Sequence, residues 1–318
     1  MNIVLITPAA KGSQSGNRVT AVRWGRILRR LGHRVRISTE FDGQRADLMV
    51  AIHAWRSARA AREFKAKFPT APLVVLLSGT DIYRYQSEDP STTLATMELA
   101  DWLVGLHDRV HLDIPERFRK KLSIIYQSCR PLAKARQLVR RHFQVCVVGH
   151  LRDEKDSLRA AYAARLVPQE SRLRLVHLGN AHDETWAKLA REEAKANPRY
   201  KWLGSVAHSQ VRGYYSRCHA MVMSSVMEGG ANVVSEAIVA GLPVLASDIS
   251  GNRGLLGENH AGYFPVGDEV ALAKLLFKAE KTHGFLQHLS SAAARRANLF
   301  APDLEYRRWY EVLERFSY

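Results

Sequence analysis

Two glutamates that flank a glycine turn are the residues of this sequence best placed to do chemistry. Glu228 and Glu236 stand eight positions apart, with Gly229 and Gly230 between them. Glycines let a ligand approach the backbone, and the first amides of a helix starting near Ala231 would be available to an anion such as a diphosphate. One carboxylate can then hold ribose hydroxyls and the other sugar hydroxyls. The spacing alone also fits a surface turn followed by a helix with a solvated glutamate, which is the commoner arrangement.

The residues around this turn predict a βαβ unit. Residues 221–225 have strand character, residues 237–240 continue the helix, and Gly241 ends it before a short apolar strand at 243–246. Such a turn lies at the carboxyl edge of a parallel sheet, where open α/β folds bind ligands. The glutamate pair, followed by Ala-x-x-x-Gly-x-Pro-Val from Ala237, resembles the signature of the GT-B glycosyltransferases of retaining family 4. The resemblance implies an α/β fold of two Rossmann-like domains whose parallel sheets face across a cleft.

A second turn, after the predicted strand at 144–148, supplies cations. In the family this turn carries Gly-Arg-Leu and a lysine six positions after the glycine, and both cations face the donor diphosphate. Gly149 and Lys155 fit that pattern. His150 stands at the place of the arginine, so Arg152 is expected to supply the missing charge with a bidentate fork. A basic turn in a basic protein is the alternative.

The resemblance implies a donor-binding set that spans both turns. Residues 202–206 resemble the family strand whose backbone edge contacts the nucleobase, although a plain buried strand is an equally good interpretation. The donor-binding residues implied in this way are Gly149, Arg152, Lys155, Leu203, Gly204, Glu228, Gly229, Gly230, Ala231, Asn232, Val233 and Glu236.

The loop between the first strand and the first helix suits an anion. It offers glycines, hydroxyls and cations around a helix N-terminus. In family 4 the same loop is glycine-rich and touches the acceptor and the donor phosphates, whereas a flexible surface loop is the alternative. The acceptor-binding or phosphate-binding residues expected here are Lys11, Gly12, Ser13, Gly16, Asn17 and Arg18.

Two further strand ends add candidates for the acceptor side. His53 follows the apolar run 48–52, and it is predicted as a catalytic residue, although a lone histidine at a strand end is more often structural. Another strand, at 73–78, precedes the next polar cluster. The additional acceptor-binding residues expected from these ends are Gly79, Thr80, Asp81, Gln127 and Ser128.

Four segments resemble a narrower branch of the family. They are residues 16–24, 51–58, 77–83 and 127–128. With them the chain resembles, over nearly its whole length, the selenosugar synthases of bacterial selenoneine biosynthesis. The resemblance implies that selenophosphate attacks a UDP-sugar, typically UDP-N-acetylglucosamine, to give a 1-seleno sugar, UDP and phosphate. The basic loop would hold the trianionic acceptor, and other enzymes of that pathway would be partners.

The expected mechanism follows from the charge that develops. As the anomeric bond to UDP lengthens, negative charge grows on the diphosphate, so fixed cations and helix amides stabilise the leaving group. Lys155 and Arg152, with the amides of Asn232 and Val233, are expected to do this, while Glu228 orients the sugar. An ionised selenium nucleophile needs little help from a base. The sequence holds no Asp-x-Asp pair of the kind that carries a divalent metal, so neither a metal nor another cofactor is expected.

The alternation of strands and helices predicts two parallel-sheet domains, at 1–135 and 142–300. An amphipathic helix at 302–318 follows, and in the family it crosses back onto the first domain. The expected strands of the first sheet are 2–8, 34–39, 47–54, 73–78, 102–106 and 123–127. Those of the second sheet are 144–148, 173–178, 201–203, 221–224 and 243–246.

Two helices are predicted in more detail. One covers about 17–31 and ends at Gly32, because Val19, Val22, Ile27, Leu28 and Leu31 recur near helical spacing. The other is a basic helix that ends near residue 141.

Composition agrees with a two-domain protein that binds small anions. The 318 residues are 46% hydrophobic and 25% charged, which is ordinary for globular domains. No apolar run approaches the roughly 20 residues of a membrane span, and a signal-peptide pattern is lacking, so a cytoplasmic protein is predicted. Despite a net charge of +16, the arginines are scattered and no nucleic-acid partner is expected. Anionic small substrates or a membrane surface fit the charge.

The sequence contains three cysteines, and alternative functions also remain open. Cys129, Cys146 and Cys218 have neither an even count nor metal-ligand spacing, which predicts reduced thiols, no disulfide and no zinc site. An ordinary family 4 transferase acting on a sugar, lipid or small alcohol, a UDP-sugar epimerase and a basic interaction protein with an inactive transferase fold remain alternatives.

Overall fold

The computed structural model describes residues 1–13 and 15–316, and its contacts divide the chain into two compact units. Unit 1 comprises Met1–Ser128, the short segment Glu228–Asn232 and the segment that begins at Ala301. Unit 2 comprises Cys129–Met227 and Val233–Phe300. The sequence predicted domains at 1–135 and 142–300. Residues 317–318 of the predicted closing helix lie outside the described residues.

Unit 1 contains a six-stranded parallel sheet in the order β2-β1-β3-β4-β5-β6. Its chain order reverses at β1, which has β2 on one side and β3 on the other. The strands are β1 (Asn2–Ile6), β2 (Arg34–Ser38), β3 (Leu48–Ile52), β4 (Leu73–Leu76), β5 (Trp102–Gly105) and β6 (Leu122–Ile124). The helical segments are α1 (Gly16–Arg30), α2 (Ala58–Lys67), η1 (Asp81–Tyr85), α3 (Gln86–Glu88), α4 (Pro90–Leu99), α5 (Val110–Asp113), η2 (Glu116–Lys121) and α13 (Pro302–Glu314).

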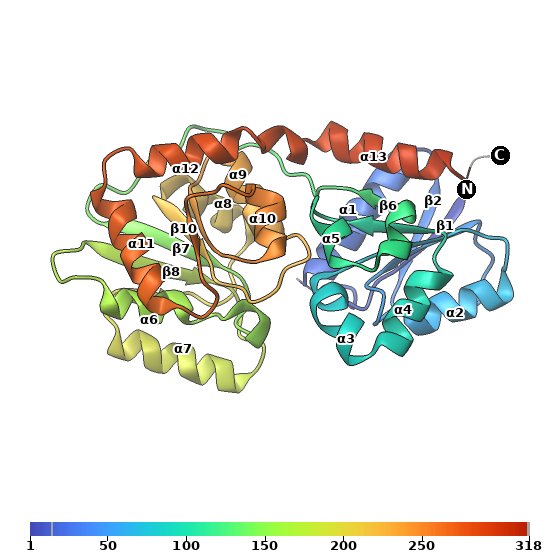
Figure 1. Ribbon diagram of the computed structural model, residues 1–318, viewed down its shortest axis with the longest axis horizontal. Coiled ribbons are helices and arrows are strands. Elements are labelled where there is room, and N and C mark those ends of the chain that lie inside the picture. Colours follow the sequence, from blue (N-terminus) through green and yellow to red (C-terminus); the bar gives the residue numbers. More distant parts are fainter. Residues whose placement is uncertain (14, 317–318) are drawn as a thin grey trace. The chain divides into compact units, whose positions relative to one another are not determined.

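Alternate residues of these strands feed two separate cores, one on each face of the sheet. Val4, Met49 and Val75 pack with α2, α4 and α5. Their neighbours Leu5 and Val50 pack on the opposite face with α1 and α13, and Figure 1 shows these two helices on the other side of the sheet from α2 and α4. Successive side chains of a strand point to opposite faces, so a strand buried on both sides is apolar throughout, as the sequence of β3 is.

The first helix is present as predicted and buries Leu28 of the predicted apolar positions, but its buried face is shifted away from Val19. α1 buries Thr20, Ala21, Trp24 and Leu28, whereas Val19, one of the apolar positions used for the prediction, is 41% exposed. The reason lies in α13, whose aromatic residues offer Trp24 a partner that the local spacing does not reveal.

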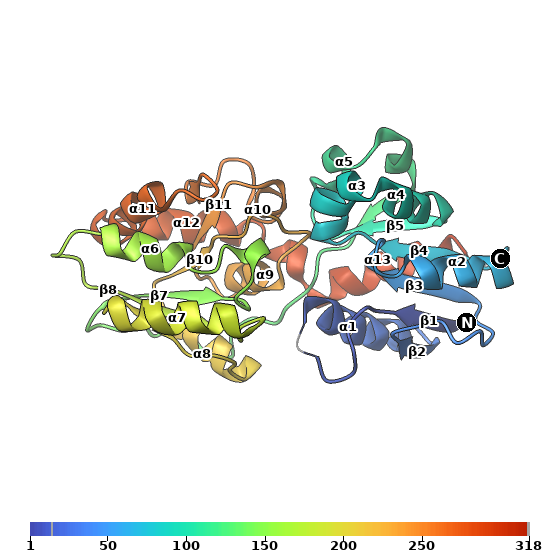
Figure 2. The same cartoon turned by 90° about the horizontal axis from the view of Figure 1, so that it is seen from below.

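Unit 2 contains a second six-stranded parallel sheet, in the order β12-β11-β10-β7-β8-β9. Its strands are β7 (Phe143–Val148), β8 (Leu173–Leu178), β9 (Tyr200–Trp202), β10 (Ala220–Met223), β11 (Val244–Ser247) and β12 (Tyr263–Phe264). Its helical segments are η3 (Asp153–Lys155), α6 (Arg159–Leu166), α7 (Glu184–Ala196), α8 (His208–Arg217), α9 (Asn232–Val239), α10 (Ser250–Leu256), α11 (Glu269–Lys281), α12 (Phe285–Ala294) and η4 (Ala297–Phe300). One core joins β7 and β8 to α6 and α11, which lie on the same side of this sheet in Figure 2. Both sheets confirm the α/β prediction.

The structure corrects one prediction in unit 2 and adds a strand that was not predicted. Residues 132–141, all of them described, form no helix. Their backbone amides bond to the end of α8 instead, at Ser216 and Arg217, and the Arg136 guanidinium donates to the carbonyls of Cys218 and Gly241. The strand β12 was not predicted, because two residues are too few to show a strand period.

The three cysteines are free thiols, and Cys146 and Cys218 are buried. No helix within the described part of the chain is long and apolar enough to cross a membrane.

Candidate functional site

Unit 2 has a pocket where its sheet changes direction. The chain runs from β7 to β8 on one side and returns to β10 on the other, and ligands of open α/β folds bind at such switch points. The pocket lies beyond the carboxyl ends of β7 and β10. It is lined by Val147, Val148, Gly149, His150, Lys155, Ser157, His177, Val222, Met223, Ser224 and Ser225. Two of the predicted donor-binding residues, Gly149 and Lys155, are therefore brought together.

A buried histidine fixes the start of the turn after β7. His177 Nε2 lies 3.1 Å from the carbonyl oxygen of Gly149, and its Nδ1 lies 3.1 Å from the Tyr200 hydroxyl. Burial lowers the pKa of His177 to about 4, so the ring is neutral at neutral pH and donates one hydrogen bond. A Cβ atom at Gly179 would lie 1.9 Å from the same carbonyl oxygen. Only glycine at position 179 permits this approach.

The rest of the turn is held by hydroxyls. Ser157 Oγ accepts from the amide of Arg152 at 3.0 Å, and Ser224 Oγ donates to the carbonyl of Lys155 at 3.1 Å. The Arg152 side chain, predicted to contact the donor, is 47% exposed and lies 3.8 Å from Glu154. It does not belong to the described residues that line the pocket.

Glu236 lies on α9 with both carboxylate oxygens engaged. Oε1 is 3.0 Å from His208 Nε2, and Oε2 accepts from the Tyr215 hydroxyl at 3.1 Å. Burial, with Glu236 nearby, raises the pKa of Tyr215 well above its usual value. Tyr215 therefore remains a hydrogen-bond donor that fixes the carboxylate.

The residues predicted to face the nucleobase follow β9. The Leu203 amide donates to the carbonyl of His177 at 2.9 Å, and the Gly179 amide donates to the carbonyl of Gly204 at 2.8 Å. The Trp202 indole donates to the carbonyl of Gly179 at 2.8 Å. This segment thus braces the turn that carries Gly149.

The glycine turn between the two glutamates groups with unit 1. Glu228 is buried, and a Cβ atom at Gly229 would lie 2.3 Å from the Gly79 nitrogen, within unit 1. Asn232, the first residue of α9, accepts from Arg23 Nη1 at 3.0 Å. Ala231 is buried. The absence of side chains at 79 and 229 therefore allows two backbones to touch.

The predicted anion loop of unit 1 leads into α1. Lys11, Gly12 and Ser13 are exposed, as is Gly16, whereas Asn17 and Arg18 are partly buried. Ser15 begins the helix: its hydroxyl accepts from the Arg18 amide at 3.4 Å. Sequence reasoning did not select Ser15, although serine before a helical run is a typical N-cap.

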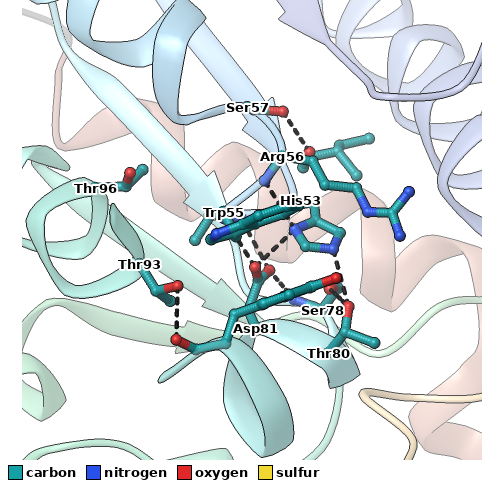
Figure 3. A network of polar contacts seen from close by, with 12 residues as sticks. His53, Trp55, Arg56, Ser57, Ser78, Thr80, Asp81, Thr93 and Thr96 are labelled. Carbon is teal, nitrogen blue, oxygen red and sulfur yellow. Dashed lines mark hydrogen bonds and ion pairs between the residues drawn. The ribbon is translucent and has the colours of Figure 1, made fainter. Parts of the chain in front are cut away.

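A polar network occupies the ends of β3 and β4 in unit 1, and Figure 3 shows it. His53 Nδ1 lies 2.7 Å from Asp81 Oδ1, and Nε2 lies 2.9 Å from the Thr80 hydroxyl. The Arg56 amide nitrogen is also 3.2 Å from Nδ1. The Asp81 carboxylate can only accept and the Arg56 amide can only donate, so Nδ1 stands between an acceptor and a donor. Nε2 is the atom that faces Thr80.

Strain accompanies this network. His53 has a φ of 78°, in the left-handed region, and η1, which follows β4 and begins at Asp81, is a π-helix. Both features are uncommon and concentrate at functional sites. Trp55 stacks on Tyr85 with ring centroids 4.1 Å apart, a pair that the sequence analysis did not single out. Neither the strain nor the stacking has a signal in the sequence.

The last two predicted acceptor residues bond within unit 1. Gln127 is buried and donates to the Thr20 hydroxyl. The Ser128 amide donates to Glu305 Oε2 at 2.9 Å, and its hydroxyl donates to the same atom. These contacts tie β6 and α13 to α1.

Comparison with known proteins identifies the family. The family model for "Glycosyl transferases group 1" matches residues 132–296, just over half of the chain. The chain belongs to the group 1 glycosyl transferases. The matched region contains the pocket after β7 and all of α9.

A curated relative of this glycosyl transferase is "Amylovoran biosynthesis glycosyltransferase AmsK" of Erwinia amylovora. The two are 25% identical over 193 residues, which cover 58% of this chain and 47% of the relative. The chain thus matches about half the length of that protein.

Solved structures share the fold over the whole chain. HepE of Anabaena in complex with UDP has a TM-score of 0.77 at 15% identity and covers 99% of this chain and 100% of its own. Sucrose-phosphate synthase of Thermosynechococcus elongatus has a TM-score of 0.77 at 17% identity and covers 99% and 98%. At such identities the likeness shows the fold, which is that of GT-B glycosyltransferases as predicted.

Among residues 1–13 and 15–316, no group of three or more His, Cys, Asp and Glu side chains is arranged to hold an ion.

Proposed function

We propose that this chain transfers a sugar from a UDP-sugar, UDP-N-acetylglucosamine in the first instance, to selenophosphate. Family membership supports the transferase part. The observation that supports a UDP-sugar as the donor is the pocket at the β7–β10 switch point, which Lys155 helps to line. Glu236, held by Tyr215 in the same unit, supplies a carboxylate suited to ribose hydroxyls. HepE, which shares the fold, has been solved with UDP and with UDP-glucose.

The acceptor half rests on residues of unit 1. Segments 16–24, 51–58 and 77–83 resemble selenosugar synthases, and the loop before α1 offers Lys11 and Arg18 beside helix amides. Cations and helix N-termini stabilise anions, and selenophosphate is a small trianion. This composition supports an anionic acceptor in unit 1.

The proposed reaction balances as two steps. The anomeric C–O bond to UDP breaks while a C–Se bond to selenophosphate forms, and UDP leaves with the electron pair. Water then cleaves the Se–P bond, releasing phosphate and the 1-seleno sugar. Lys155 would stabilise the charge that grows on the diphosphate, because a fixed cation acts most strongly where charge develops. No metal step is part of the proposal.

The experiment is UDP release from UDP-N-acetylglucosamine under anaerobic conditions, with and without selenophosphate, followed by mass spectrometry of the product. We expect selenophosphate-dependent UDP and a selenium-containing hexosamine, unchanged by a chelator. Lys155→Ala is expected to lower the rate by about 100-fold, since removing one transition-state contact typically costs two to three orders of magnitude. Lys188→Ala, at a position 73% exposed on α7, serves as the control. Epimerisation without UDP release, or UDP release at the same rate with and without selenophosphate, would contradict the proposal.

One observation favours a hydroxyl acceptor as the second candidate. In the tautomer that carries its proton on Nδ1, facing Asp81, His53 turns Nε2 as an acceptor towards the Thr80 hydroxyl. Thr80 can then give its proton to Nε2 and accept one from a substrate hydroxyl. A sugar or small alcohol that releases UDP faster than selenophosphate does would favour this candidate.

A further inference from the structure

We propose that His150, rather than Arg152, is the residue of the β7–α6 turn that donates a side-chain hydrogen bond to the nucleotide phosphates. The inference rests on the proposed function, because it assigns the phosphates of UDP to the pocket after β7. His150 lines that pocket with Lys155.

The orientation of the His150 ring is set by a backbone amide. The Asn180 amide nitrogen lies 3.1 Å from His150 Nδ1. A backbone N–H can only donate, so Nδ1 is the acceptor and the ring proton belongs on Nε2. The ring of His150, a residue of the pocket lining, therefore carries its hydrogen-bond donor on Nε2, and its acceptor nitrogen is already used.

The backbone that carries His150 is equally fixed. The preceding carbonyl, at Gly149, accepts from His177 and lies against Gly179, where a Cβ atom would come within 1.9 Å of it. The next amide, at Leu151, donates to the Asn180 carbonyl at 2.9 Å. Asn180 thus holds both the ring of His150 and the backbone after it. A side chain held at both ends pays little entropy on binding, which favours it as a ligand contact.

Other polar groups of the turn are directed at the protein. The Ser157 and Ser224 hydroxyls contact backbone groups of residues 152 and 155–156. Arg152 extends to Glu154, with 47% of its side chain exposed. Lys155 then supplies positive charge to the pocket, and His150 supplies a hydrogen-bond donor of fixed orientation. This division differs from the expectation that Arg152 replaces the family arginine.

The test is the affinity of the full-length chain for UDP and for uridine, measured by calorimetry. His150→Asn is the sharpest variant, because its side-chain oxygen can still accept from Asn180 while nothing occupies the place of Nε2. We expect UDP to bind about 10- to 100-fold more weakly, as for a lost hydrogen bond to a charged group, and uridine to bind as in the wild type. His150→Gln, whose amide reaches the place of Nε2, should recover part of the UDP affinity.

Two arginine variants complete the design. Arg152→Ala should lose less UDP affinity than His150→Asn, and Arg191→Ala, at an exposed position on α7, should bind like the wild type. The inference is overturned if His150→Asn binds UDP normally, if it loses UDP and uridine equally, or if Arg152→Ala loses more. Failure of the wild type to bind UDP would instead overturn the proposed function, so the two failures are distinguishable.

Discussion

At the scale of single residues, Asp81 joins two strand ends that would otherwise be independent. Its carboxylate accepts from the amides of Ala54, Trp55 and Ser78, at 2.8 to 2.9 Å. His53 makes a fourth contact, and Asp81 is only 1% exposed. The loops after β3 and β4 are thus held by one side chain. A residue predicted to bind the acceptor therefore also organises the backbone around it.

Replacing Asp81 should show how much that organisation contributes. Asp81→Ala leaves three amides without an acceptor and removes the contact with His53, and each buried unsatisfied group costs about 1–3 kcal/mol. We expect the free energy of unfolding to fall by at least about 3 kcal/mol, measured by urea denaturation followed by circular dichroism. The control is Asp42→Ala, since Asp42 is 41% exposed and pairs with Arg36. Exposed pairs contribute under about 1 kcal/mol. Equal effects of the two variants would contradict this role.

The sequence could predict these residues only in part. Strand ends and turn chemistry placed Gly149, Lys155 and His53 at carboxyl edges of the sheets, and the structure has them there. The partners of His53 could not be predicted, because a hydrogen bond to Thr80, 27 positions away in the sequence, leaves no local pattern. His150 was noted only as a departure, although its bond to Asn180 decides how it can act.

At the scale of elements, α13 completes the core of unit 1. Trp309 on α13 and Trp24 on α1 are both fully buried, with ring centroids 4.7 Å apart in an edge-to-face arrangement. The Trp24 indole donates to Glu305 Oε1 at 2.9 Å. Figure 2 shows α13 behind the strands of the first sheet and α2 in front of them. A segment that is last in the sequence therefore covers the helix that is first.

Truncating Trp309 should therefore destabilise unit 1 strongly. Removing a buried aromatic side chain costs about 3–5 kcal/mol through lost transfer energy and the cavity left behind. We expect Trp309→Ala to lower the free energy of unfolding by that amount, with circular dichroism as the probe because a tryptophan is lost. Tyr310→Ala is the matched control on the same helix, since Tyr310 is 50% exposed and should change stability by less than about 1 kcal/mol. A loss as large at position 310 would rule out the Trp309 packing as the cause.

The same contact explains where sequence reasoning about elements succeeded and failed. Eleven of the twelve strands lie close to their predicted ranges, because buried parallel strands are short continuous apolar runs. Of the positions used to predict the apolar face of α1, Leu28 is buried and Val19 is exposed, whereas Trp24, which was not used, is fully buried. Helical spacing identifies several possible faces, and only the partner helix chooses among them.

At the scale of the whole molecule, each unit buries a histidine that resists protonation. Burial lowers the pKa of His107 in unit 1 and of His177 in unit 2 from 6.5 to about 4. The unfolded chain therefore binds these protons more readily than the folded chain. Neither histidine lowers the free energy of unfolding above pH 6.5, where both are neutral in the folded and the unfolded chain. Each one lowers it as the pH falls from 6.5 towards 4. With about 1.4 kcal/mol for each pKa unit, the loss is about 3 kcal/mol for each histidine.

Acid should consequently lower the free energy of unfolding of both units, and two variants can separate the contributions of the two histidines. We expect the stability of the wild type to decrease steadily between pH 6.5 and pH 4, as measured by urea denaturation at a series of pH values. His107→Asn and His177→Asn each remove one buried titrating ring, so the difference in unfolding free energy between neutral and acidic pH should shrink by about 3 kcal/mol in each variant. The comparison uses this difference rather than absolute stability, because either substitution also changes packing at every pH. If both variants kept the full acid dependence of the wild type, carboxylates elsewhere would account for it and the two histidines would not.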